Sequence, residues 1–373
     1  KDIGKCLWII MKISIGSKIV EGPWGGGNLF VKNLSQYLIG NGHKVIYDLS
    51  EPDIDLILLT DPRSRKESSS SFNHIEINKY KEHVNRNVKV IQRINECDER
   101  KDTENINEFY LEASNSADHV VFVSSWLENI YLELGMNKEK TIVILAGANR
   151  NIFNDKDSSE WIENTKLKLV THHWSANKNK GFEYYQEINN LIKSKKWKDQ
   201  IEFTYIGNVH PDYDLSNTRI LKPLSGKELA TEIKKNHIYI TGTINEPSGN
   251  HHIEAAQCGL PILYLESGGV PEYCQEYGVG FKNDIEKSLE LLINNYHEYR
   301  NKLKYYPHNS DKMCEEFLFC FEELVEENST LKNEKTTLKG LSYLMVIKLT
   351  VIFRENIYQS SKNIIKKIIK KIT

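Results

Sequence analysis

The chain has 373 residues, with 49 lysines and arginines against 51 aspartates and glutamates and a formal net charge of −2. This balance excludes the overall basic field with which proteins gather nucleic acid, so no nucleic-acid partner is expected. Hydrophobic residues make up 39% and charged residues 27%, which excludes a disordered chain, and the length favours two domains.

The six cysteines contain no Cys-x-x-Cys pair and no spacing typical of metal ligands. This usage excludes a structural zinc site and favours reduced thiols in a protein that is cytoplasmic or faces the cytosol.

The short apolar run before Lys12 is not followed by a small-residue cleavage site, so it is not typical of a signal peptide. The β-branched residues of segment 8–20 instead predict a first buried strand.

Apolar, β-rich runs alternate with helix-length segments along the rest of the chain, as in 28–42 and 226–236. The expected strands are 12–20, 43–49, 54–60, 88–94, 119–124, 141–145, 166–174, 201–207, 237–243 and 261–267. This alternation predicts an α/β protein with parallel sheets and ligands at the carboxyl ends of the strands.

The polar segment 149–165 separates two blocks of this alternation. We therefore expect a Rossmann-like domain over 11–155, a second over 156–330, and a helical extension over 331–373.

A polar turn follows the expected strand 237–243, and it contains Glu246, Ser248 and Gly249. A helix is expected to begin near Asn250. Free amide groups at a helix N-terminus favour an anion, and a glycine lets a ligand approach the backbone.

One turn into that helix, Glu254 is placed to accept hydrogen bonds from sugar or ribose hydroxyls. The next strand ends in a second turn of small residues that includes Gly268 and Gly269. Two adjacent helix N-termini would form one site for a polyanion.

The order Glu246, seven residues, Glu-Ala, Cys-Gly-x-Pro and Gly-Gly-x-Pro-Glu resembles the donor site of retaining, family 4 type glycosyltransferases of the GT-B fold. Segment 22–45, GPWGGGNLFVKNLSQYLIGNGHKV, resembles the N-terminal glycine loop and helix of that family. With further matches in DLILLTDPR, VIQRINECDERKDT, ADHVVFVSSWL and HHWSANKNKGFEYY, the resemblance covers about residues 12 to 325.

The resemblance implies two Rossmann-like domains that face a cleft, and a nucleotide-sugar donor as substrate. It also implies that no metal and no cofactor are required. Glu246 and Lys180 would be the catalytic residues, because the first lies near the donor sugar and the second neutralises the diphosphate that leaves. Glu254 would bind the ribose. The backbone of Ser248, Gly249, Asn250, Gly268 and Gly269 would contact the sugar and the diphosphate.

The sequence departs from this family five residues before Lys180, where an arginine is common and this chain has Ser175. Either His172, His173 or Asn177 then compensates in the phosphate binding, or the phosphate is bound more weakly. The alternative for Lys180 is a solvated loop lysine, and Glu246 and Glu254 could be a turn residue and a helix carboxylate.

On the acceptor side, Gly25, Gly26 and Gly27 would allow close approach of the donor phosphate and the acceptor; a flexible turn is the alternative. This segment lacks the Gly-x-Gly-x-x-Gly register of a dinucleotide site. The residues after strand 88–94 are candidates for contacts with sugar hydroxyls: Arg93, Asn95, Glu96 and Asp98.

The C-terminal segment changes character. Its apolar run from Leu341 to Phe353 is too short to span a bilayer, which needs about 20 residues. In segment 364–372, isoleucines and lysines fall on different faces of a helix, which is typical of a basic amphipathic helix on an anionic membrane surface. Docking on its own domain or on another subunit, or a coiled coil, is the alternative.

The sequence thus predicts a retaining glycosyltransferase that moves a sugar from a nucleotide diphosphate to a glycan or lipid-linked glycan. The expected setting is bacterial surface polysaccharide synthesis, such as that of lipopolysaccharide, on the inner face of the membrane. A catalytically silent GT-B protein that binds a glycan or partner, and a nucleotide-sugar epimerase, are the alternatives.

Overall fold

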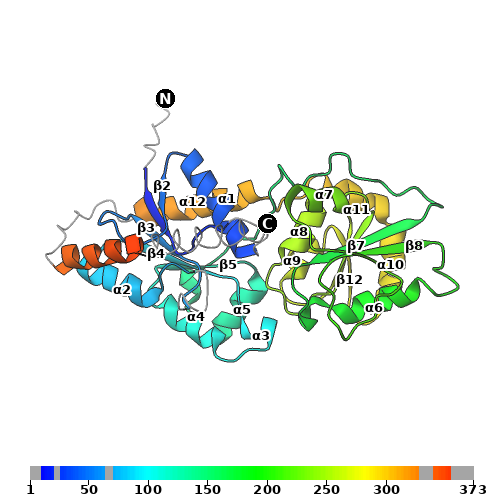
Figure 1. The fold of residues 1–373 in the computed structure, drawn as a ribbon, viewed down its shortest axis with the longest axis horizontal. Helices are drawn as coiled ribbons and strands as arrows, with labels where there is room; N and C mark the ends of the chain where they lie inside the picture. The colour runs from blue at the N-terminus through cyan, green and yellow to red at the C-terminus, as the bar shows by residue number, and fades with distance from the viewer. Residues whose placement is uncertain (1–9, 21–25, 64–69, 327–338, 354–373) are drawn as a thin grey trace, which may run out of the picture.

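The computed structural model describes residues 10–20, 26–63, 70–326 and 339–353. Two parallel sheets of six strands each lie side by side, and helices cover both faces of each sheet (Figure 1). The predicted pair of α/β domains is therefore confirmed.

The first sheet has the strand order β2-β1-β3-β4-β5-β6. Its strands are β1 (Lys12–Ile15), β2 (Lys44–Ile46), β3 (Leu56–Leu59), β4 (Lys89–Ile94), β5 (His119–Phe122) and β6 (Thr141–Val143). Its helices are α1 (Gly26–Gly40), α2 (His74–His83), α3 (Asp98–Lys101), α4 (Ile106–Ser114) and α5 (Ser125–Glu133). Leu56 and Leu58 join one apolar core while Ile57 and Leu59 join the other. Because both faces of β3 are buried, this strand is apolar throughout.

The second sheet has the order β12-β11-β10-β7-β8-β9. Its strands are β7 (Leu167–His173), β8 (Ile201–Gly207), β9 (Arg219–Leu221), β10 (Ile238–Thr241), β11 (Ile262–Leu265) and β12 (Gly278–Phe281). Its helices are α6 (Phe182–Leu191), α7 (Gly226–Ile233), α8 (Asn250–Gln257), α9 (Val270–Cys274), α10 (Ile285–Asn294) and α11 (Tyr296–Leu303). Every strand predicted from the sequence is present. The sequence did not predict β9 and β12, which form the two edges.

The domain boundaries differ from the prediction at the two places where the chain passes from one domain to the other. Helix α12 (Ser310–Glu326) returns to the first domain, where Phe317 packs on Phe30 of α1 with ring centroids 5.1 Å apart. Its apolar stripe completes the core on that face of the first sheet. In the other direction, Ala146 and Phe153 belong to the core of the second domain.

Helix 339–353 is the described part of the predicted extension, and it lies against α2 (Figure 1). Leu344 is buried in the core of the first domain. This contact fits the alternative that the extension docks on its own domain. Segment 364–372, with its isoleucines and lysines, lies outside the described residues. Within the described ranges, no helix has the length and apolar character needed to cross a bilayer.

The cysteines in the described part of the chain are free and buried. Burial raises the pKa of the Cys258 thiol to about 12, so the reactive thiolate is scarce at neutral pH. These side chains serve as small apolar packing groups.

Candidate functional site

Glu246 lies in the turn after β10, where the two domains meet, and its side chain is buried. Its carboxylate contacts two cations: Lys180 Nζ at 2.7 Å and Arg100 Nη2 at 3.1 Å. Lys180 ends the 3-10 turn that follows β7, and β7 pairs with β10, so the sheet brings this lysine to Glu246. Arg100 comes from α3 of the first domain.

The two cations determine the charge of Glu246. Burial alone would raise the pKa of this carboxyl group, but Lys180 and Arg100 outweigh burial and hold it at about 2. Burial likewise opposes the charge of Arg100, and Glu246 and Glu96 raise its pKa above the ordinary value. The site is therefore a buried carboxylate between a lysine and an arginine side chain.

Two further hydrogen bonds join α3 to the second domain beside this cluster. Asn179 Nδ2 donates to Arg100 O at 2.9 Å, and Asn245 Nδ2 donates to Glu99 O at 3.0 Å. Arg100 was not among the site residues predicted from the sequence. The available signal was a basic residue shortly after a strand that ends at the site, but acidic neighbours surround it in the segment ECDERKDTE.

Glycines allow the backbone to pack closely around Glu246. Gly249 has φ of +73°, and a Cβ there would lie 3.0 Å from Glu246 Cγ. Gly268 has φ of +63°, and a Cβ there would lie 2.5 Å from Glu246 O. Gly269 N–H donates to Glu246 O at 2.9 Å. That amide supports the turn, although the sequence analysis assigned it to the donor.

The glycine turn at the start of α1 in the first domain lies against the turn that precedes α8 in the second domain. A Cβ on Gly26 would lie 3.0 Å from Asn250 Nδ2 at the start of α8, whereas Gly27 faces open space. Ser248 is half-buried in this turn. Gly25 lies outside the described residues. The α8 N-terminus therefore lies beside the first residues of α1, and α9 is too short, at 5 residues, to match α8 as a helix dipole.

Glu254 of α8 is buried and pairs with a histidine. Its Oε2 lies 3.0 Å from His172 Nε2, and His172 Nδ1 lies 3.1 Å from the Tyr239 hydroxyl. The chain Tyr239, His172, Glu254 fixes the orientation of this carboxylate. The predicted contact of Glu254 with a ribose stays a prediction.

The candidates to replace the missing arginine form hydrogen bonds with groups other than Glu246. The ring of His173 is buried, with Nε2 2.6 Å from the Tyr185 hydroxyl, and burial lowers its pKa well below the ordinary value. Ser175 and Asn177 are exposed, and their side-chain oxygens accept backbone N–H groups of their own loop. Among the described residues, Arg100 is the arginine that the structure brings to Glu246.

The other residues predicted for the acceptor side lie at the carboxyl end of β4. Arg93 is buried with its guanidinium 4.0 Å from the centre of the Phe30 ring, and burial lowers its pKa to about 10. Asp98 accepts hydrogen bonds from the hydroxyl of Thr103 and from the first two amides of α4, so it holds the connection between α3 and α4. Asn95 is half-buried.

Glu96, the last of the residues predicted for the acceptor side, pairs with two cationic side chains. Its carboxylate lies 2.5 Å from Lys101 Nζ and 3.4 Å from Arg100 Nη1. It therefore helps to hold Arg100 in place.

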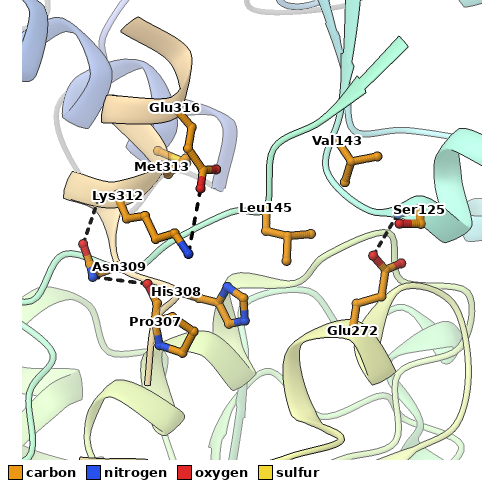
Figure 2. Close-up of a pocket in the computed structure, with 10 residues that line it drawn as sticks. All are labelled: Ser125, Val143, Leu145, Glu272, Pro307, His308, Asn309, Lys312, Met313 and Glu316. Carbon is orange, nitrogen blue, oxygen red and sulfur yellow. Dashed lines mark hydrogen bonds and ion pairs between the residues drawn. The ribbon is translucent and has the colours of Figure 1, made fainter. Parts of the chain in front are cut away.

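A second contact between the domains is made by Glu272 of α9. Figure 2 shows its carboxylate facing Ser125, and it accepts the amides of Ser125 and Trp126, each at 2.9 Å. These amides begin α5, where a negative charge is favoured. A cavity of about 320 Å³ lies between this contact and the chain crossing near His308. The residues predicted for the donor and acceptor sides do not line it.

No family model matches the chain. The gpi3 subunit of phosphatidylinositol N-acetylglucosaminyltransferase from Schizosaccharomyces pombe is 23% identical over 203 residues, which are 50% of this chain and 43% of that relative. The match thus covers less than half the length of the relative.

Two solved structures are similar over both domains. A glycosyltransferase from Rickettsia africae ESF-5 has a TM-score of 0.62 at 15% identity, with 85% of this chain and 99% of that one covered. Anabaena HepE in complex with UDP and glucose has a TM-score of 0.57 at 15% identity, with 86% and 100% covered. The chain has the two-domain GT-B fold of glycosyltransferases.

Proposed function

We propose that the chain is a glycosyltransferase that moves a glycosyl group from a nucleotide diphosphate sugar to a glycan acceptor, with retention, in the manner of family 4. The observation that supports this most is the cluster at Glu246, where Lys180 and Arg100 converge from two domains.

The charges of this cluster suit the departure of a nucleoside diphosphate. Negative charge grows on the diphosphate as the glycosidic bond breaks, and cations in a buried site stabilise it strongly. Lys180 and Arg100 are the cations, and the ionised Glu246 is suited to accept hydrogen bonds from hydroxyls of the sugar. The leaving phosphate takes the proton of the acceptor, so no separate base is assigned.

The α8 N-terminus and Glu254 are the proposed binding groups for the rest of the donor. Amides at the start of α8 favour the diphosphate. Glu254, oriented by His172, is placed one turn further to accept hydrogen bonds from a ribose. UDP and glucose in HepE, a protein of the same fold, support a nucleotide-sugar donor.

The proposed acceptor is a glycan of a bacterial surface polysaccharide, free or linked to a lipid. The acceptor side is the carboxyl edge of the first sheet, which carries Gly26 and Arg93. The chain is proposed to work on the cytosolic side, because its described cysteines are free thiols.

The test is hydrolysis of a panel of labelled nucleotide sugars by the purified chain without acceptor. We expect slow release of free sugar from one donor, and loss of this release in Lys180→Ala. Binding of a donor without turnover would favour a silent GT-B protein, and an isomerised donor would favour an epimerase.

A further inference from the structure

Helix 339–353 encloses a cavity against the first domain. One face of the helix is docked: the Tyr343 hydroxyl donates to Glu76 O at 3.3 Å, and Leu344 is only 5% exposed. Beside this contact a cavity of about 660 Å³ remains, which is within the usual range for ligand pockets.

The lining of this cavity is mainly apolar, with polar groups from Lys18, Asp48, Glu76 and Lys79. The apolar lining includes Ile19, Leu49, Phe72, Val346, Ile347 and Val351. Val346 is 59% exposed and Ile19 is 40% exposed, so the cavity continues to the surface. This combination suits an apolar chain that carries a polar head.

The cavity lies at the carboxyl ends of β1 and β2. These strands are parallel to β3 and β4 in one sheet, so their carboxyl ends share an edge with the segment that follows β4 and contains Arg100. The cavity and the Glu246 cluster therefore lie along the same edge of the first sheet.

The outer face of helix 339–353 carries a second apolar surface. Its residues recur at helical spacing, and each is more than half exposed: Leu341, Met345, Leu349, Ile352 and Phe353. The sequence that follows, 354–373, has six lysines and arginines and one glutamate. Apolar side chains next to positive charge suit an anionic lipid surface.

We propose that the cavity binds the hydrocarbon chain of a lipid-linked glycan acceptor, whose sugar lies along the sheet edge toward Glu246. This inference rests on the proposed glycosyl transfer and names the class of its acceptor. Helix 339–353 then has two roles, with its docked side forming the pocket and its outer side facing the lipid from which the acceptor comes.

The probes that test this are n-alkyl β-D-glucosides with six, eight and ten carbons, each below its micelle concentration. Each buried methylene contributes about 0.8 kcal/mol, close to a fourfold change in the dissociation constant. Calorimetry should therefore show binding that tightens about 15-fold for each added pair of methylenes.

Two substitutions on the same helix locate the binding. Val346→Asp should remove the dependence on chain length, because Val346 lines the cavity. Leu349→Asp should keep it, because Leu349 is similarly exposed, at 56%, but faces outward. Thr350→Trp, which fills the cavity without a charge, repeats the test if Val346→Asp does not fold.

The proposed pocket would be contradicted if binding to the wild type does not depend on chain length. It would also be contradicted if Val346→Asp and Leu349→Asp lose this dependence equally. Equal loss together with a change in oligomeric state would assign this face to a second copy. Donor hydrolysis is measured separately. If donor hydrolysis is absent but binding still depends on the alkyl chain length, the proposed transferase activity is contradicted. If donor hydrolysis is present but binding does not depend on chain length, only the proposed pocket is contradicted.

Discussion

Two glutamates of the second domain reach the first domain, and they are bound in different ways. Glu246, after β10, meets the side-chain cations Lys180 and Arg100. Glu272, after β11, meets two backbone amides at the start of α5. Backbone amides are fixed in place, whereas cations on side chains can turn from a carboxylate to a phosphate. The comparison indicates that Glu272 joins the domains, and it supports the proposed role of Glu246 in the chemistry.

The largest expected difference is in turnover. Glu246→Gln should lower the rate of donor hydrolysis by about 100-fold or more, because it removes a charge from a buried site where electrostatic groups act strongly. Glu272→Gln should lower it by about threefold at most. The two rates are measured on the same donor, and equal losses would contradict the distinction between the two glutamates.

Arg100 tests whether the first domain contributes charge to the donor site. Arg100→Ala should lower kcat/KM for the donor about tenfold, since hydrogen bonds to charged groups contribute about 1.5 to 3 kcal/mol. Arg100→Lys should recover part of the loss.

Lys101→Ala is the matched control, because Lys101 pairs with Glu96. An unchanged kcat/KM in Arg100→Ala would make this arginine a structural residue only.

The dependence of stability on pH sharpens the comparison further. In the unfolded chain Glu246 takes up a proton near pH 4.5, but in the folded protein its pKa is about 2. The stabilisation is present above 4.5 and is lost as the pH falls toward 2. When the pH is lowered from 6 to 3.5, protonation of Glu246 in the unfolded chain should therefore lower the free energy of unfolding by about 1.4 kcal/mol.

In Glu246→Gln, the free energy of unfolding should fall by about 1.4 kcal/mol less between these two pH values. Urea unfolding at both pH values measures it in each protein. The same loss in the wild type and in Glu246→Gln would show that the carboxylate is not held by its cations.

The smallest expected effect concerns Glu272. Glu272→Ala should lower the free energy of unfolding by about 1 kcal/mol, as the loss of a helix cap does, and should leave donor binding intact. Thermal unfolding and donor titration measure the two quantities. Weaker donor binding without a change in stability would reverse the roles assigned to the two glutamates.

The sequence was sufficient for most of the fold, because long apolar runs between helical segments are typical of strands buried on both faces. The two strands that it did not predict are edge strands: β9 has three residues, and β12 contains two glycines. The amphipathic stripe of α12 predicts a buried face, but not the sheet that it covers. Its return to the first domain depends on tertiary packing with α1.

The candidate site was predictable where its residues lie on neighbouring strands. Glu246, Gly268 and Lys180 follow strands of one sheet, and the order of motifs placed them together. Arg100 lies 146 residues from Glu246, and their contact depends on how the two domains meet. His173 was assigned to the donor as a replacement for the arginine that is missing at Ser175, but its ring is buried beside Tyr185.

The most direct test of the central claim is calorimetric titration with UDP, GDP and ADP of the wild type, Lys180→Ala and Lys178→Ala. Lys178 pairs with Asp212 at the surface and is the matched control. The account predicts that at least one nucleoside diphosphate binds, and that Lys180→Ala weakens it ten- to 100-fold while Lys178→Ala does not. Binding that is equal in all three proteins, or absent from the wild type, would contradict a diphosphate site at Glu246.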